Sequence, residues 1–278
     1  MAADRLVEKA AKVAALSTPL DMAISQADRE TLAMVRAAID ARRVRLAWQP
    51  VVMAADVTRI AFHEGLVRVL DSSGRIIPAR DFMGAVERNE MGREIDCLAL
   101  EHGLATLARQ PDLRVSVNVS ARSIGYPRWQ RVLNKGLAAA STIAERLILE
   151  IGEESAMTVP ETVSAFMAEM QKEGVAFALD DFGGGTTALG RLRDFYFDFA
   201  KIDARAVRGI DRDADVKALA AALVGVARPF GMVTVAVAVE TATEGEILRG
   251  LGVDCLQGYL IGAPRLKPAW EEAGARQA

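Results

Sequence analysis

The chain has 278 residues, of which 51% are hydrophobic and 5% aromatic, and its 34 basic and 37 acidic residues give a net charge of −3. Neither sign of charge forms a long block, which excludes a broad electrostatic surface for duplex nucleic acid or an anionic membrane. No apolar run approaches the roughly 20 residues of a membrane span, and the N-terminal residues lack the apolar stretch of a signal peptide.

Strand-like and helical patterns alternate along the chain from residue 28 onward. The spacing of Leu32, Val35 and Ile39 predicts a helix from Asp28 to Arg43, with Asp28 as its cap. Apolar runs then predict eight strands, over residues 44–53, 58–70, 114–119, 146–151, 175–180, 197–202, 232–239 and 254–261. Helical patterns occupy residues 81–109, 160–173, 187–194, 213–228 and 243–251, and the segment between the third and fourth strands is mixed.

This alternation predicts a mainly parallel sheet with helices outside it, and eight strands favour a closed barrel. Only residues 54–57 join the first two strands, too few for a parallel crossover, so that pair should be antiparallel. The predicted fold is an α/β, TIM-like (β/α)8 barrel with an irregular, partly antiparallel start. We assign residues 28–278 to this barrel domain and residues 1–27 to an N-terminal extension or linker helix. Cys97 and Cys255 lie in apolar surroundings without a CxxC pair, so we interpret them as reduced core residues and expect a cytoplasmic protein.

Polar residues occur where the predicted strands end, and in a barrel of this kind the carboxyl ends of the strands form the functional face. The hard oxygen donors at these positions are Glu64, Asn118, Glu150, Asp180 and Asp181. A charge after an apolar strand is costly unless a cation offsets it, and oxygen-only ligands favour Mg²⁺, Mn²⁺ or Ca²⁺ over zinc. The doubled carboxylates at 180 and 181 also suit a bridged pair of metals.

Alternation along residues 58–70 places Glu64, Leu66 and Arg68 on the same face of their strand, so a carboxylate and a guanidinium can share one pocket. Taken singly, a strand-end carboxylate is more often a helix cap or a salt-bridge partner, and Gln49 reads as an ordinary buried amide. Asn118 taken alone is more often a turn residue, and Lys201 is either a surface charge or part of a buried pair. His63 and His102 have no ligand cluster near them in the sequence. The joint placement of the carboxylates is what favours a metal site.

Seven segments, in order, resemble the EAL domain family, the cyclic-di-GMP phosphodiesterases and their degenerate relatives. The segments are WQPVV, HEGLVR, SVNVS, LEIGEES, ALDDFGGG, AKIDARAV and LQGYLIGAP, and the resemblance runs from about Glu30 to Pro264. The resemblance implies metal-assisted hydrolysis of one phosphodiester of cyclic-di-GMP with Mg²⁺ or Mn²⁺. The first metal would be bound by Glu64, Asn118, Glu150 and Asp180, and Asp181 would help to bind a second.

The resemblance also implies roles for other residues. Lys201 would order the attacking water, and Glu153 would support the loop that follows the Asp pair. The dinucleotide pocket would be lined by Gln49, Leu66, Arg68 and Gln257. Asp203 and Glu240 end strands of the same series and are further pocket candidates.

The chain departs from the family pattern at three places. The family motif Ala-Glu-Gly-Val-Glu reads Ala-Val-Ala-Val-Glu at residues 236–240, so Val237 replaces a glutamate that the family uses as general base or second-metal ligand. Glu240 lies three residues further on and would point to the opposite face of a strand. The loop after the Asp pair contains three consecutive glycines at 183–185, which should make it more mobile, and Ala204 replaces an arginine.

The sequence therefore favours a degenerate EAL domain that binds cyclic-di-GMP with little or no hydrolysis and signals through a protein partner. The pattern predicts the first metal site, whereas Val237 argues against the second. An active phosphodiesterase, in which Glu240, Glu244 or a metal-bound hydroxide replaces the missing base, is the alternative, and a nucleotide-independent interaction scaffold is a third possibility. Family members often pair near the Asp-pair loop, so a homodimer is a further expectation.

Overall fold

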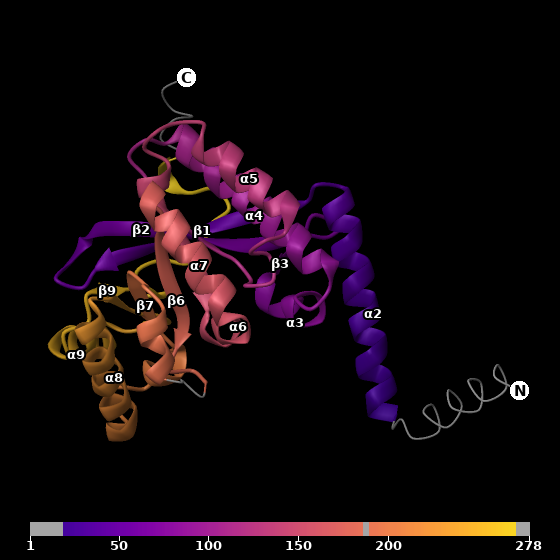
Figure 1. Cartoon of the computed structure of the whole chain (residues 1–278). Coiled ribbons are helices and arrows are strands. Elements are labelled where there is room, and N and C mark those ends of the chain that lie inside the picture. Colours follow the sequence, from indigo (N-terminus) through magenta and orange to yellow (C-terminus); the bar gives the residue numbers. More distant parts are fainter. Residues whose placement is uncertain (1–18, 186–188, 271–278) are drawn as a thin grey trace, which may run out of the picture.

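An eight-stranded barrel closed by its first two strands forms the centre of the computed structural model, which describes residues 19–185 and 189–270 (Figure 1). The barrel strands are β1 (Val44–Met53), β2 (Asp56–Leu70), β4 (Val115–Asn118), β5 (Leu147–Gly152), β6 (Ala176–Phe182), β7 (Phe199–Ile202), β8 (Val233–Ala236) and β9 (Cys255–Leu256). They follow one another in the order β1-β9-β8-β7-β6-β5-β4-β2, and pairing of β1 with β2 closes the ring. A ninth strand, β3 (Ile76–Pro78), pairs only with the end of β2.

The antiparallel start comes from β1, which runs against both of its neighbours, β2 and β9. Residues 54–55 join β1 to β2 in a tight turn, a connection that allows only an antiparallel pair. From β2 onward the barrel strands are parallel, with helices in the crossovers. The predicted TIM-like barrel with an irregular, partly antiparallel start is confirmed.

Helices surround the barrel. They are α2 (Pro19–Asp40), α3 (Met83–Val86), α4 (Glu90–Arg109), α5 (Pro127–Leu137), α6 (Glu153–Thr158), α7 (Pro160–Met170), α8 (Ala214–Ala227) and α9 (Ala242–Gly250). Short 3-10 turns lie at Ala79–Asp81, Ala144–Arg146, Gln171–Glu173, Leu189–Asp194, Ala204–Ala206 and Arg228–Phe230. Side chains cap three helix starts: Asn89 at α4, Asp213 at α8, and a Thr241–Glu244 capping box at α9.

Three apolar clusters hold these layers together. The largest fills the space between the outer face of the barrel and helices such as α4, α5 and α7. A second cluster docks the C-terminal half of α2 through Val35 and Ile39, and Figure 1 shows the rest of α2 extending away from the barrel. The third lies inside the barrel and includes Phe62, Ile148 and Val235. Among the described residues, no helix is long and apolar enough to cross a membrane.

Several predicted bounds were wrong for local reasons. The helix expected at 81–109 is interrupted after Val86, where Asn89 caps a new helix, and α2 begins at Pro19 rather than Asp28. Residues expected to be mixed contain α5, whose Trp129 is buried. Of the helix expected at 187–194, residues 187–188 lie outside the described residues and the remainder is a 3-10 turn. The predicted extension 1–27 lies mostly outside them as well.

Candidate functional site

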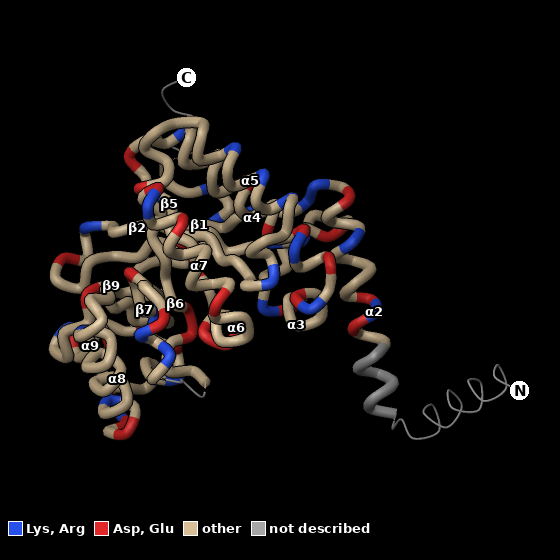
Figure 2. The backbone as a smooth tube through the Cα atoms, in the orientation of Figure 1, with Lys and Arg blue, Asp and Glu red and all other residues tan. Residues whose placement is uncertain are grey.

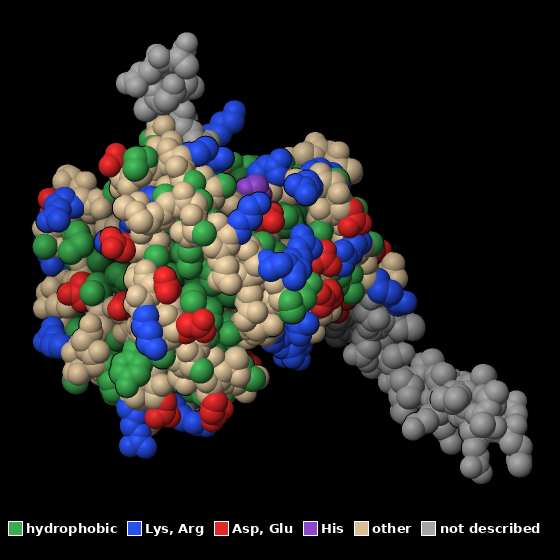
Figure 3. Space-filling view, turned by 45° about the horizontal axis from the view of Figure 1, so that its top comes forward, with side chains coloured by type: hydrophobic (Ala, Val, Ile, Leu, Met, Phe, Trp, Pro, Cys, Tyr) green, Lys and Arg blue, Asp and Glu red, His purple; other side chains and the backbone are tan. Residues whose placement is uncertain are grey.

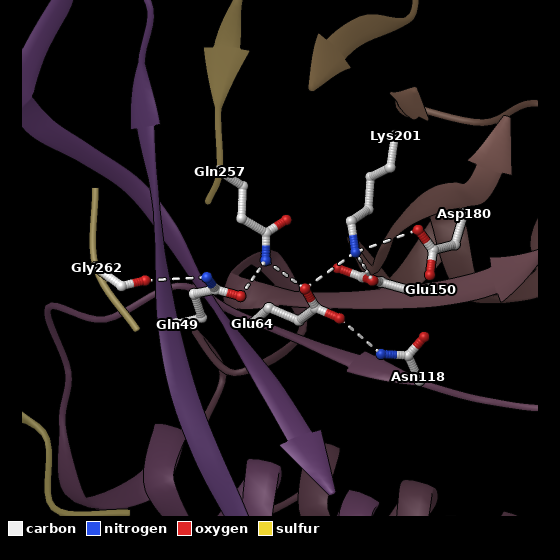
Figure 4. Close-up of polar contacts among 8 residues, drawn as sticks. All are labelled: Gln49, Glu64, Asn118, Glu150, Asp180, Lys201, Gln257 and Gly262. Carbon is white, nitrogen blue, oxygen red and sulfur yellow. Dashed lines mark hydrogen bonds and ion pairs between the residues drawn. The ribbon is translucent and has the colours of Figure 1, made fainter. Parts of the chain in front are cut away.

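A layer of polar side chains lies directly above the third apolar cluster, the one inside the barrel, which we name the plug. Plug residues Phe62, Ile148 and Ala178 each lie two positions before a carboxylate, at 64, 150 and 180 respectively. Because side chains alternate along a strand, residues two apart face the same way. The polar residues therefore point into the barrel at the carboxyl ends of the strands, and Figure 4 shows them converging there.

Three carboxylates form the centre of this layer. Oxygen atoms of Glu64, Glu150 and Asp180 all lie within 4.8 Å of one another, the one such acidic group among the described residues. Glu150 is fully buried and Glu64 is 4% exposed, whereas the Asp180 side chain is 23% exposed and faces the mouth. We name these residues the acidic triad. The sequence prediction that these strand-end carboxylates meet is consistent with this geometry.

Lys201 lies among the three carboxylates of the acidic triad. Its ammonium donates a short hydrogen bond to Glu150 and lies 3.1 Å from Glu64 and 3.3 Å from Asp180. The side chain is 2% exposed, so little water screens these ion pairs. Lys201 is therefore a buried counter-ion, rather than the solvated surface charge that the sequence also allowed.

Burial and mutual repulsion set the protonation of the acidic triad. Burial, and then the charges of Glu64 and Asp180, raise the pKa of Glu150 to about 8, although Lys201 opposes them. Burial also acts to raise the pKa of Glu64, but Lys201 and hydrogen bonds from Gln257 and Asn118 outweigh it, so that pKa is lowered. Burial opposes the charge of Lys201, yet the three carboxylates hold its pKa well above the usual range. The layer thus retains more negative charge than one ammonium balances.

Amide side chains connect the acidic triad to β1 and to the C-terminal segment. Asn118 donates to Glu64 at 2.9 Å, and Gln257 donates to Glu64 at 2.5 Å and to Gln49 at 3.2 Å. Gln49 in turn donates to the carbonyl of Gly262 at 2.9 Å. The predicted pocket residues Gln49 and Gln257 therefore belong to one hydrogen-bonded chain with the metal-ligand candidates.

The donor set of the layer fits a hard divalent cation. Glu150 Oε1 and Gln257 Oε1 are buried and have no hydrogen-bond partner among the described residues. Such orphaned acceptors are costly unless a ligand satisfies them. The acidic triad, with the amide oxygen of Asn118 after an amide flip, offers the oxygen-only ligands that Mg²⁺ and Mn²⁺ prefer.

Arg68 lies at the edge of the same site. It is half-buried, and its Nη1 donates to the carbonyl of Val67 at 2.8 Å. Burial and the nearby Arg80 lower its pKa, while Glu64 and Tyr259 act in the opposite direction. Leu66, on the same face of β2, is partly buried. A guanidinium and a carboxylate thus share one side of the strand, as the alternation predicted.

Asp181 departs from the layer. Its backbone φ of 57° is left-handed, and its side chain is exposed, unlike that of its neighbour Asp180. Burial of part of the group, with the charges of Asp180 and Asp203, raises the pKa of Asp181 to about 6. Glu153 accepts a hydrogen bond from the backbone N of Gly183 at 3.2 Å, which supports the turn after Asp181.

A cavity of about 800 Å³ opens beside Asp181 at the ends of β4, β5 and β6. Its charged lining is mixed and includes Arg88, Arg122, Arg205, Glu153, Glu154 and Asp181. Sequence reasoning missed Arg205, which binds Asp203, and also Asp96, a buried carboxylate that accepts from Ser123 Oγ and from the Ser120 backbone N. No local pattern marks Asp96, because folding brings its serine partners close, whereas Asp203 and Arg205 lie only two residues apart in the sequence.

No carboxylate points into the barrel at the carboxyl end of β8, among the described residues. Alternation places Val237 in the polar layer, two residues after the plug residue Val235, where it offers neither a proton acceptor nor a ligand. Glu240 is exposed, and its nearest basic partner is Arg208 at 3.9 Å. Glu244 accepts hydrogen bonds from the backbone N of Glu240, Thr241 and Gly209, so its side chain is committed to the start of α9.

Charges on the outside of the molecule are mixed in sign. Figure 2 shows basic and acidic residues interspersed along the described chain, and on the face in Figure 3 they alternate with apolar and neutral side chains. The concentration of like charge is therefore inside the barrel mouth rather than on a broad surface.

Comparisons with known proteins agree with this geometry. The family model named EAL domain matches residues 32–264. The chain is 30% identical over 208 residues to the cyclic di-GMP phosphodiesterase PdeF of Escherichia coli (strain K12), which covers 73% of this chain and 28% of PdeF. It is 33% identical over 233 residues to an uncharacterized signaling protein of Caulobacter vibrioides, covering 82% of this chain and 28% of that protein. The chain thus spans little more than a quarter of these relatives.

Solved structures show the same fold. The PaMucR phosphodiesterase in complex with c-di-GMP superposes with a TM-score of 0.75 at 26% identity, covering 87% of this chain and 99% of the other. The FimX EAL domain of Pseudomonas aeruginosa bound to c-di-GMP gives a TM-score of 0.76 at 22% identity, covering 85% of this chain and 96% of the other. At this identity the likeness shows the fold alone.

Proposed function

Because this chain belongs to the EAL domain family, whose model matches residues 32–264, we propose that it binds cyclic di-GMP at the barrel mouth as a receptor, with little or no hydrolysis. The observation that carries the proposal is Val237, an apolar residue in an otherwise polar layer. Binding would be read out by a protein partner, since a receptor that does not turn its ligand over must pass the signal on.

The residues of the layer suit a cyclic dinucleotide in complementary ways. Arg68 brings a guanidinium whose planar donors match a phosphate, and its partial burial strengthens that contact. Gln49 and Gln257 offer amide groups of the kind that bond to base edges, and Gln257 Oε1 is a buried acceptor without a partner among the described residues. PdeF and PaMucR, which are named for cyclic di-GMP, support this ligand class.

A divalent cation held by the acidic triad and Asn118 would supply charge neutralisation for a phosphate of the ligand. Lys201 lies among the carboxylates of the acidic triad and keeps its proton. Its ammonium can therefore attract a phosphate or orient a water molecule but cannot accept a proton. Glu64 and Asp180 are needed for charge balance around Lys201.

The missing element is a proton acceptor on the open side of the site. Val237 provides none, and general-base assistance alone is worth about 10²–10⁴ in rate. The residues proposed from sequence as substitutes are badly placed, because Glu240 is exposed beside Arg208 and Glu244 is bonded to three backbone N–H groups. Binding is therefore retained while turnover is lost.

An active phosphodiesterase is the second candidate. The observation that favours it is the intact acidic triad with Lys201 at its centre, which includes three of the four first-metal residues that the family resemblance implies. A scaffold that binds no nucleotide is the third candidate, and the buried charges argue against it. A group of carboxylates around one ammonium is costly to fold and serves no packing purpose.

Calorimetric titration of cyclic di-GMP with and without Mg²⁺, alongside a hydrolysis assay, separates the three candidates. A receptor binds the ligand and produces no linear product, whereas hydrolysis by the unchanged protein above a metal-only blank refutes the proposal. If cyclic di-GMP binds neither with nor without Mg²⁺, the interaction scaffold is the candidate that remains.

The matched pair Val237→Glu and Val237→Gln then tests the role of that position. Both side chains are similar in size, but only glutamate accepts a proton or binds a metal. We expect hydrolysis to appear in Val237→Glu and not in Val237→Gln. Equal activity in the two variants would show that Val237 is not the cause of the loss.

A further inference from the structure

An ion pair between Arg205 and Asp203 lies beside Asp181, at the outer edge of the polar layer. We infer that this chain holds one divalent cation rather than two, because Arg205 places a guanidinium in the cavity beside Asp181, where a second cation would have to bind. The inference rests on the proposed function only for the identity of the first site, the acidic triad. Gly184, Asp203 and Arg205 contact one another, and we name them the outer clamp.

Asp181 lies apart from the acidic triad. Among the described residues, the acidic cluster with oxygens within 4.8 Å of one another consists of Glu64, Glu150 and Asp180 and does not include Asp181. The left-handed φ of 57° at Asp181 interrupts the alternation of side chains along the strand. Asp180 therefore lies in the acidic triad, whereas Asp181 does not. Asp181 instead lines the 800 Å³ cavity together with Gly184, Gly185 and Arg205.

The ion pair of the outer clamp has defined geometry. Arg205 Nε lies 3.0 Å from Asp203 Oδ1, and Nη2 lies 3.4 Å from Asp203 Oδ2. Asp203 Oδ1 also accepts from the backbone N of Arg205 at 2.7 Å, which fixes the carboxylate. The Asp203 side chain is 12% exposed and the Arg205 side chain is 70% exposed, so the pair is anchored at its acidic end and the guanidinium lies on the open side of the cavity.

Gly184 is what lets the guanidinium lie against the turn. A Cβ at this position would lie 2.6 Å from Asp203 Oδ2 and 2.9 Å from the carbonyl oxygen of Asp181, and it would overlap Arg205 Nη2. Any larger residue would therefore displace the ion pair. The turn itself is closed by Gly184 N, which donates to the carbonyl of Asp181 at 2.9 Å. Gly184 and the ion pair therefore form a matched set in this chain.

The remaining groups of the cavity do not complete a second cation site. Val237, directly after β8, offers no ligand atom. Glu153 Oε2 accepts from Gly183 N, so only its buried Oε1, which has no hydrogen-bond partner among the described residues, is available from that residue. Arg88, Arg122 and Arg205 place three guanidinium groups in the same cavity as Asp181, Glu153, Glu154 and Glu87. A second divalent ion beside Asp181 would meet the positive charge of Arg205, and Asp181 would bind it without the carboxylates of the acidic triad.

Titration of the full chain with Mn²⁺, without nucleotide, counts the sites directly by electron paramagnetic resonance of free Mn²⁺. We expect one ion per chain, lost in Glu150→Gln and retained within about twofold affinity in Asp181→Asn. Two ions in the unchanged protein, one of them lost in Asp181→Asn, would overturn the inference. Because this readout uses no nucleotide, it stands even if cyclic di-GMP fails to bind and the proposed function falls.

A second set of variants tests the outer clamp. Val237→Glu combined with Arg205→Gln should bind two Mn²⁺ ions, whereas Val237→Glu combined with Arg212→Gln should bind fewer than two. Arg212 is a matched control, because it is a well-exposed arginine that pairs with its neighbour Asp211, away from the acidic triad. A folded Val237→Glu/Arg205→Gln protein that still binds one ion, with folding checked by circular dichroism, refutes the role given to Arg205.

Discussion

Replacing Lys201 by methionine removes the one ammonium that the structure places among the acidic triad. Methionine keeps most of the volume and leaves three carboxylates facing one another in a buried site. Removing one partner of a buried ion pair typically costs about 3–5 kcal/mol, since the other charge stays buried and uncompensated. We therefore expect the free energy of unfolding in EDTA at pH 8 to fall by about 3–5 kcal/mol.

The loss should depend on pH with a definite sign. The pKa of Glu150 is already raised to about 8, and removing Lys201 raises it further. A carboxyl whose folded pKa is raised binds more protons in the folded state, so its stabilising effect is present at low pH and lost as pH rises through the folded pKa. The destabilisation by Lys201→Met should therefore be smaller at pH 6 than at pH 8.

The assay is urea unfolding at pH 6 and pH 8, in EDTA and in millimolar Mn²⁺. A cation that binds only the folded protein stabilises it by about RT ln(1 + [L]/Kd), so Mn²⁺ should stabilise the variant more than the unchanged protein. Arg212→Met serves as the control for loss of a positive charge at the surface. A Lys201→Met protein within about 1 kcal/mol of the original in EDTA at pH 8 would show that the ammonium is not the counter-ion of the triad.

Three further changes test other features of the fold. Burial raises the pKa of Asp96 to about 7, so the stability that its protonated form contributes is lost as pH rises from about 4 through 7. In urea unfolding, the free energy of unfolding of Asp96→Asn should gain about 1–3 kcal/mol on that of the unchanged protein between pH 5 and pH 8. A difference between the two proteins that stays constant with pH refutes this. Ala238 has a left-handed φ of 57°, which is strained for a residue with a Cβ, so Ala238→Gly should raise stability by about 0.5–1 kcal/mol. Ala236→Gly, in β8, should lower it. Equal effects of the two changes in thermal unfolding would contradict backbone strain at Ala238. A Cβ at Gly65 would lie 2.9 Å from Leu46 and 3.0 Å from Trp48, so Gly65→Ala should cost about 1–3 kcal/mol. An unchanged melting temperature would show that the core relaxes around the added methyl group.

Much of the barrel and of its polar layer could be predicted from the sequence because both depend on local periodicity. Glu64, Glu150 and Asp180 each follow an apolar residue by two positions, and that spacing alone fixes the face on which they lie. The short link after Met53 was likewise enough to predict the antiparallel start. The strand β3 was missed because it is three residues long and pairs only with the end of β2.

Features that depend on long-range contacts could not be predicted in this way. The backbone of Asp181 adopts a left-handed conformation within a strand pattern, so alternation gives no guide to its side chain. Arg205 read as an ordinary charged residue until the fold placed it against Gly184. Glu244 looked available as a substitute base, but folding commits it to the capping box of α9.

The balance of charge in the polar layer connects Val237 with the single cation. With all three carboxylates ionised, as a bound cation would require of Glu150, the acidic triad and Lys201 leave two negative charges, which one divalent cation cancels. A glutamate at 237 would add a further negative charge in the same layer, and only a second cation or an extra proton would balance it. If, as we infer, Arg205 excludes a cation beside Asp181, valine at position 237 avoids a negative charge that no second cation would balance. On this proposal Val237 and the outer clamp are two parts of one arrangement, and restoring glutamate alone should leave an unbalanced negative charge in the layer until Arg205 is also removed.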